Sequence, residues 1–313
     1  MVRFLCGRAR SGKTRRVITE MTDSVCRRLV LLVPEQYSHS MERLLCASAG
    51  ARISRTAEVL SFKQMSERVF ARAGNLARRV PDRGARILMM QRALSQAGAG
   101  LKTFSASTER PEFLSTLIDT AEELKTCRIK PESLMDITDG ALGDKLCDIA
   151  RICAAYDGMF AEGEIDAADE LTLVAQGIES CSFFSGTEVW IDGFSGFTPQ
   201  EYEILKLIFA QSDMCTVTLC LNNDADDECG AFKKPWDTFN KLKRFAGDCK
   251  VIKLDTYSEN IPQSLAHLEK NVFRQAPEIC DSCEGVELYR VDGIYEECAT
   301  ALARATELVR DGG

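Results

Sequence analysis

The chain has 313 residues, 45% of them apolar, and a formal net charge of −8 at pH 7. This length and apolar fraction allow a large buried core and favour two domains over one. No run approaches the roughly 18 apolar residues of a membrane span, and early arginines exclude a signal peptide, so we expect a cytoplasmic protein without a membrane partner. Among the 14 cysteines, several lie in apolar runs, which predicts reduced core residues: Cys6, Cys46, Cys215 and Cys220.

The charge divides unevenly along the chain. Residues 1–92 carry 19 Lys and Arg against 7 Asp and Glu, whereas the remainder carries 20 against 40. Seventeen of the 19 early cations are arginine, the side chain that forks onto phosphates and stacks on bases. This excess favours an anionic partner for the first part of the chain, with mutual neutralisation of the two parts as the alternative.

The first predicted elements surround a phosphate-binding motif. Residues 7–14 match G-x-x-x-x-G-K-[ST] at every fixed position, after an apolar strand at 2–6 and before a helix with apolar spacing from Val17. In this motif the glycines let backbone N–H groups point at phosphate oxygens, the lysine reaches the β- and γ-phosphates, and the threonine ligates magnesium. We therefore predict an ATP and Mg²⁺ site formed by Gly7, Arg8, Ala9, Arg10, Ser11, Gly12, Lys13 and Thr14.

A second buried strand is predicted at residues 30–33, followed by Glu35 and Gln36. Ligands gather outside the carboxyl ends of strands in an open α/β sheet, so we place Gln36 in the nucleotide site. Capping of the next helix is the alternative interpretation of this pair. A further strand and helix follow, with Ser61 as the expected helix cap.

Residues 81–185 differ from their surroundings, because long helical periodicities dominate and strand signal is weak. We predict an all-helical insertion domain there. The α/β pattern returns at 188–192 with a strand that ends on Asp192, and such an aspartate holds the magnesium shell in phosphate-loop proteins. Residues 1–80 and 186–313 would then form one discontinuous α/β domain.

Later elements continue the α/β pattern. We predict a helix from Pro199, and we interpret His39 and His267 as structural. Cys280 and Cys283 form a lone C-x-x-C without a second pair, which does not favour a metal site. The chain stops directly after a predicted helix, and we expect it to be a fragment of a longer protein. The remaining expectations are strands at 214–221, 251–254 and 286–291, an acidic turn at 222–229, and helices at 238–245 and 296–309.

Several segments are informative when they are taken together: 7–14, 32–36, 60–62 with 68–69, 191–194, 197–201 and 296–310. Together they resemble the N-terminal part of the AddB (RexB) subunit of the bacterial AddAB helicase-nuclease. The resemblance covers essentially the whole chain. It implies a superfamily-one helicase-like, RecA-like phosphate-loop NTPase core with a helical insertion, and pairing with an AddA-type motor subunit at double-strand DNA ends in recombinational repair. It also implies that the nuclease, a second helicase-like domain and the iron–sulfur elements lie beyond residue 313.

One departure from active helicases concerns the hydrolytic base. Those proteins carry Asp-Glu at the end of the second catalytic strand, whereas here Asp192 is followed by Gly193. We therefore expect ATP binding with weak or absent hydrolysis. The resemblance implies, in addition, no nuclease activity in this chain and a DNA-holding role in place of motor function. The DNA-contact candidates, by position alone, are Arg10, Arg15, Arg16 and Lys63.

Two other functions stay open. The same loop serves small-molecule and nucleotide kinases, in which the helical insertion would act as a substrate lid. Alternatively, the chain is a protein-interaction scaffold that retains the loop for packing and does not hydrolyse ATP.

Overall fold

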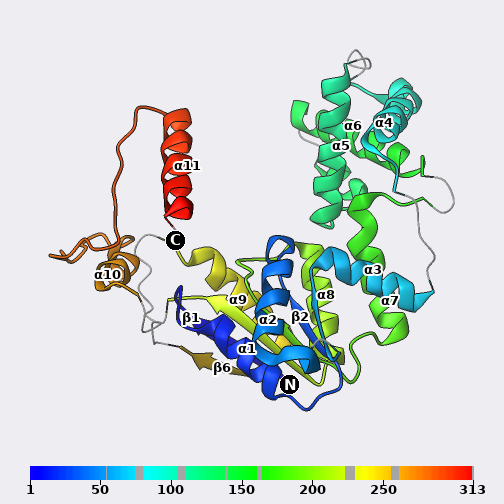
Figure 1. Ribbon diagram of the computed structural model, residues 1–313. Coiled ribbons are helices and arrows are strands. Elements are labelled where there is room, and N and C mark those ends of the chain that lie inside the picture. The colour runs from blue at the N-terminus through cyan, green and yellow to red at the C-terminus, as the bar shows by residue number, and fades with distance from the viewer. Residues whose placement is uncertain are drawn as a thin grey trace. The chain divides into compact units, whose positions relative to one another are not determined.

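The computed structural model describes residues 1–53, 55–74, 80–104, 110–137, 140–160, 164–222, 230–254 and 261–311. The chain separates into two compact units, Met1–Thr256 and Tyr257–Gly313, and each is described by itself. The first unit contains a six-stranded sheet (Figure 1). Its strands are β1 (Val2–Gly7), β2 (Leu29–Leu32), β3 (Ala57–Leu60), β4 (Glu188–Ile191), β5 (Met214–Cys220) and β6 (Cys249–Lys253).

The sheet is parallel at every pairing, in the order β3-β2-β4-β5-β1-β6. β1 lies between β5 and β6, so Val2 is in register with both Cys215 and Cys249. Because all strands run the same way, their carboxyl ends meet at one edge of the sheet. The α/β prediction is confirmed, and each strand predicted between residues 2 and 254 is present.

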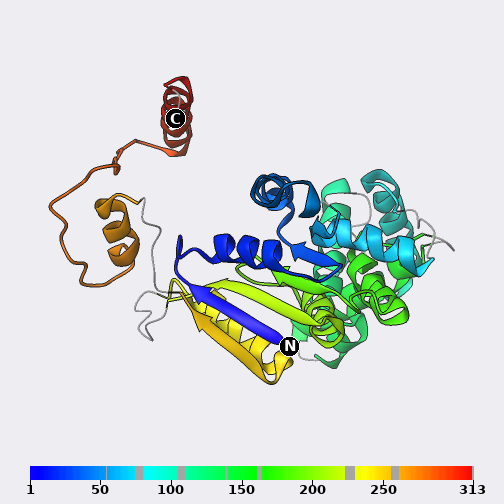
Figure 2. The same cartoon turned by 60° about the horizontal axis from the view of Figure 1, so that its bottom comes forward.

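Helices cover both faces of the sheet. Successive strand residues face opposite sides, which is why Phe4 and Leu5 belong to two different cores. Leu5 and Trp190 pack under α1 and α2, whereas Phe4 meets Phe239 of α9 with ring centroids 5.3 Å apart. Figure 2 shows α1 and α9 on opposite faces. The covering helices are α1 (Lys13–Asp23), α2 (Ser38–Ile53), α3 (Phe62–Ala73), α7 (Glu170–Cys181), α8 (Pro199–Gln211) and α9 (Lys233–Ala246).

Two of these helices begin with reciprocal side-chain caps. Ser61 Oγ accepts from the Gln64 N–H at 3.3 Å and the Gln64 side chain accepts from the Ser61 N–H at 2.9 Å, so α3 begins where the sequence predicts. Thr198 and Glu201 form the same box at α8, where Pro199 takes the first helical position. Both caps orient helices that pack against the core of the sheet.

The middle of the chain is helical, as predicted. Three helices build a core of their own around Met90, Ile118 and Tyr156 (Figure 1). By contrast, Val174 of α7 shares the core of the sheet with Val69 of α3. The insertion boundaries at residues 81 and 185 stay a prediction. The elements are α4 (Arg83–Ala97), α5 (Pro111–Thr126) and α6 (Gly140–Asp157), with short 3₁₀ turns η2 (Gly98–Gly100), η3 (Pro131–Asp136) and η4 (Ala167–Asp169).

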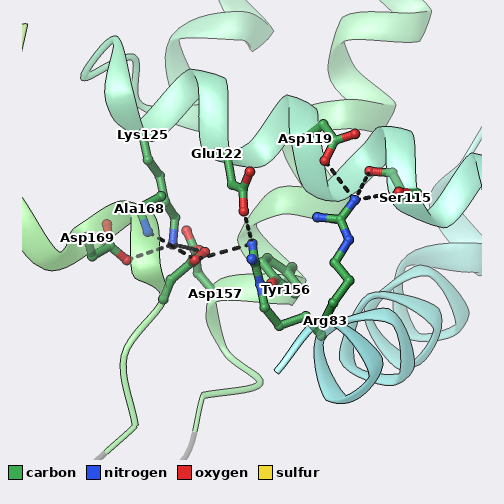
Figure 3. A network of polar contacts seen from close by, with 11 residues as sticks. Arg83, Ser115, Asp119, Glu122, Lys125, Tyr156, Asp157, Ala168 and Asp169 are labelled. Carbon is green, nitrogen blue, oxygen red and sulfur yellow. Dashed lines mark hydrogen bonds and ion pairs between the residues drawn. The ribbon is translucent and has the colours of Figure 1, made fainter. Parts of the chain in front are cut away.

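A network of charges ties these helices together (Figure 3). Lys125 Nζ of α5 lies 3.0 Å from the buried Asp166 carboxylate and 2.7 Å from that of Asp169. Arg86 of α4 lies 3.4 Å from Asp166 and donates to the Tyr156 hydroxyl of α6 at 3.1 Å. The network therefore joins three helices to the η4 turn through side chains withdrawn from water.

The second unit contains α10 (Gln263–Asn271) and α11 (Ile294–Arg310), and the predicted C-terminal helix is confirmed. The strand expected at 286–291 is wrong. Leu288 is 97% exposed, and among the residues that the structure describes no strand pairs with this segment. Its alternating residues resemble a strand, but a lone extended segment has no partner for its backbone groups.

The cysteine prediction is partly wrong. Cys6 and Cys215 are buried, but Cys46 is exposed on α2 and Cys220 is only partly buried. α2 begins after β2 without a strongly apolar face, so the apolar residues around Cys46 do not mark a core. Most of the acidic turn expected at 222–229 lies outside the described residues.

Candidate functional site

The loop between β1 and α1 has the backbone that its glycines predict. A Cβ at Gly7 would lie 2.6 Å from the Leu254 carbonyl oxygen, so only glycine fits at the end of β1. Gly12 has a φ of +82°, in the left-handed region that glycine adopts without strain. Arg10 also has a positive φ, +57°, which completes the tight curl of the loop. Within this curl Ser11 is buried.

The Lys13 ammonium lies inside the loop. Its Nζ donates to the Gly7 carbonyl at 2.8 Å, to the Arg8 carbonyl at 2.6 Å and to Ser11 Oγ at 3.4 Å. The loop therefore surrounds a positive charge, which is hydrogen-bonded to residues at the beginning and in the middle of the loop. Such an arrangement suits an anion that approaches from the open side of the loop.

The start of α1 presents backbone donors to the loop. The first bond of the helix runs from the Arg16 N–H to the Gly12 carbonyl at 2.9 Å. The N–H groups of Lys13, Thr14 and Arg15 precede it and have no acceptor within the helix. Among the described residues, no side chain caps α1, unlike α3 and α8. Backbone donors and the positive end of the helix thus face the same loop.

Asp192 connects this loop to the neighbouring strands. It follows β4 directly, is only 4% exposed, and its Oδ2 accepts from Thr14 Oγ1 at 2.7 Å. Its Oδ1 accepts from Thr218 Oγ1 of β5. The structure therefore brings together the two predicted magnesium ligands, although they lie 178 residues apart in sequence. Hydroxyl and carboxylate oxygens are the ligands that hard cations such as Mg²⁺ take.

Gly193 shapes the turn after this carboxylate. Its φ is +84°, and a Cβ here would lie 3.3 Å from Cδ of Pro34 and 3.6 Å from a ring carbon of Tyr37. A side chain at 193 would therefore be directed against the turn after β2. The backbone itself disfavours any larger residue at this position.

The other predicted site residues are less closely connected. Gln36 lies in η1 (Glu35–Tyr37) at the carboxyl end of β2 and is exposed; its role in nucleotide binding stays a prediction. Of the DNA-contact candidates, Arg16 pairs with Glu20 at 3.0 Å and Lys63 lies 3.9 Å from Glu35. Arg10 and Arg15 are exposed. Ala9 is exposed in the loop, between Arg8 and Arg10.

Thr218 was not predicted from the sequence. It lies in β5 between Val217 and Leu219, two of the alternating apolar residues that the sequence indicates, yet it is itself only 3% exposed and is hydrogen-bonded to Asp192. The sequence offers no signal for it, because a polar residue between apolar ones in a strand ordinarily faces solvent. Cys6 beside the loop is no nucleophile at neutral pH, because burial raises its pKa to about 11, although the Lys13 and Lys253 charges lower it.

Neither a metal cluster nor a membrane span is found in the part of the chain that the structure describes. Its residues hold no group of three or more His, Cys, Asp or Glu side chains that could bind a metal ion, and this includes Cys280 with Cys283. Within the same residues, every helix is too short or too polar to cross a lipid bilayer.

The whole chain is similar to known proteins. Residues 4–279 match the family described as "ADDB, N-terminal". Relatives named as a subunit of an ATP-dependent helicase/deoxyribonuclease are 34% identical in Pelotomaculum thermopropionicum, 30% in Clostridium tetani and 29% in Thermoanaerobacter sp. (strain X514). These alignments cover 99–100% of this chain, which spans about 29% of the length of each relative. The family match covers most of the chain, and the chain therefore belongs to the AddB N-terminal family.

Proposed function

We propose that the chain binds ATP with magnesium at the loop of residues 7–14. The hydrogen bond between Thr14 and Asp192 carries this proposal, because it joins the two expected magnesium ligands at the mouth of the loop. Lys13 and the N–H groups at the start of α1 would hold the phosphates. Bound magnesium would neutralise phosphate charge there. The RecA-like, helicase-like assignment of the sheet is part of this proposal.

Turnover of the bound ATP is expected to be weak or absent. Water activation needs a base within hydrogen-bond reach of the attacking oxygen. Asp192 is engaged by two threonine hydroxyls, and the following position is a glycine whose geometry disfavours a side chain. The chain's own residues thus support binding and orientation of a nucleotide better than its hydrolysis.

The wider role rests on the family. The relatives are named as subunits of an ATP-dependent helicase/deoxyribonuclease, and we extend that name to this chain as the nucleotide-binding part of such a subunit. It would work in the cytoplasm beside an AddA-type motor subunit on DNA ends in recombinational repair. The exposed Arg10 and Arg15 support DNA contact at the same edge of the sheet, because phosphate contacts give affinity without sequence readout.

Nucleotide titration of the wild type and two variants tests ATP binding. We expect Lys13→Ala to weaken MgATP binding by more than about tenfold, since it removes the ammonium that is held inside the curl of the loop. Lys145→Ala, on the exposed surface of α6, is the matched control and should bind like the wild type. Asp192→Asn should abolish the gain in ATP affinity that magnesium gives.

The outcomes separate the competing functions. Wild-type affinity in Lys13→Ala, with unchanged melting temperature, would contradict the nucleotide site. Absence of MgATP binding in the wild type would favour the scaffold, in which the Lys13 ammonium and Asp192 carboxylate serve packing alone. Transfer of the γ-phosphate to a nucleoside monophosphate would favour the kinase.

A further inference from the structure

A groove runs along β3, on the open side of the sheet. The phosphate loop lies elsewhere, at the carboxyl ends of the strands. We call this groove the β3 groove; it has a volume of about 820 Å³ and is lined by residues 56–60 along the full length of the strand. β3 is the last strand of the sheet, and within the described ranges nothing pairs with its outer side. An open sheet edge offers a row of backbone donors and acceptors.

The register of β3 identifies these groups. The Thr56 carbonyl accepts from the Leu29 N–H at 2.8 Å, and the Leu60 carbonyl accepts from the Val33 N–H at 2.9 Å. The backbone polar groups of Thr56 and Leu60 therefore face β2. In a parallel ladder alternate residues face opposite partners. Ala57 and Val59 therefore direct their N–H and carbonyl groups outward, into the groove.

One wall of the groove is rich in arginine. Arg28 and Arg72 both lie over the ring of Phe183, at 4.4 and 5.6 Å from its centroid, and Arg68 of α3 is 63% exposed. Glu58 is the carboxylate near them, 3.7 Å from Arg28 and 3.8 Å from Arg68. Three guanidinium groups thus face one carboxylate, which leaves a surplus of positive charge on the α3 side.

The opposite side of the groove is lined by residues of α2: Glu42, Cys46, and the largely buried Leu45 and Ile53, which are 3% and 4% exposed. Val59 of β3 packs on this side with the same core. An extended chain laid against β3 would place alternate side chains toward α2 and toward α3, because strand side chains alternate between faces.

We propose that the β3 groove binds an extended acidic peptide of a partner protein, which adds to β3 as a further strand. Its backbone pairs with Ala57 and Val59. Its carboxylates, at every second position, face Arg68 and Arg72, and the side chains between them face the α2 side of the groove. Strand addition to an open edge gives affinity through main-chain bonds and specificity through alternate side chains.

A nucleic acid fits the β3 groove less well. Phe183 is 2% exposed and covered by two arginines, so its ring offers no surface for base stacking. Glu42 and Glu58 line the groove and would repel a continuous row of phosphates. A strand edge, by contrast, matches the donors and acceptors of a peptide backbone.

Fluorescence anisotropy with the 313-residue chain tests the proposal. The probe is a labelled peptide of alternating valine and glutamate, long enough to span β3. We expect Arg68→Glu to weaken its binding by more than about tenfold through charge reversal. Arg92→Glu, an exposed arginine of α4 outside the groove, should stay within about twofold of the wild type.

A second peptide tests the backbone pairing. Methylation of alternate backbone nitrogens removes the donors while it keeps every carboxylate, and it should also weaken binding more than about tenfold.

Equal binding of the methylated peptide would overturn strand addition, and equal binding by Arg68→Glu and the wild type would overturn the charge argument. Tighter binding of single-stranded DNA, also lost in Arg68→Glu, would replace the peptide by a nucleic acid. Arg55→Glu, an exposed residue of the groove that precedes β3, repeats the charge test should Arg68→Glu fail to fold.

Discussion

Substitution of Gly193 tests whether the backbone explains why a glycine, and no carboxylate, follows Asp192. A residue with a Cβ at a φ of +84° incurs a strain of about 1–2 kcal/mol. The Cβ would also lie 3.3 Å from Pro34, so the turn after β2 must shift. We therefore expect Gly193→Ala to lower the free energy of unfolding by about 2–3 kcal/mol. Gly186 has a φ of +67° with open space around its Cβ position, so Gly186→Ala should cost only the strain, about 1–2 kcal/mol.

Urea denaturation measures the difference in free energy of unfolding between Gly193→Ala and Gly186→Ala. This difference reports the close contact with Pro34. Gly193→Glu then adds a carboxylate to the same backbone. Its Cβ is directed at Pro34 and Tyr37, so ATP turnover should remain at the wild-type level. Equal stability of the two alanine variants would remove the packing argument. Turnover that rises in Gly193→Glu would show that the backbone tolerates a base and that its absence has another cause.

Two further predictions concern charges and thiols away from this turn. Lys125→Met should lower the free energy of unfolding by about 3 kcal/mol, because it leaves the buried Asp166 carboxylate without its ammonium. The surface variant Lys206→Met should change it by less than about 1 kcal/mol, and similar losses in both would contradict the network. Burial raises the pKa of Cys6 and of Cys153 from 9.0 to about 11. As pH rises, the unfolded chain loses these protons first, so stability present below pH 9 should fall toward pH 11 by about 1.4 kcal/mol per pH unit for each thiol. Urea titrations in which Cys6→Ala and Cys153→Ala fail to flatten this fall would refute the assignment.

The sequence predicted features whose causes are local. The loop glycines, the Ser61 cap and the acidic end of β4 each depend on a few neighbouring residues, and the structure contains all three. It did not predict Thr218, because a threonine in an alternating strand carries no local sign that it will meet Asp192. The contact forms only through the pairing of β4 with β5.

Two other features depended on partners that the sequence pattern does not show. α2 has no strong apolar face, so its periodicity did not indicate a helix, although Leu45 and Ile53 anchor it to the core. The alternating segment 286–291 has the residues of a strand without a neighbour to pair with. Periodicity reports which residues are apolar, whereas pairing depends on distant parts of the chain.

The position of β1 in the sheet has a consequence for synthesis. β1 leaves the ribosome well before its two neighbours, β5 and β6, which begin at Met214 and Cys249. At about 5–20 residues per second, the apolar strand waits roughly 10–40 s for its first neighbour. The loop of residues 7–14 that follows β1 therefore acquires its supporting strands only after most of this chain has been translated.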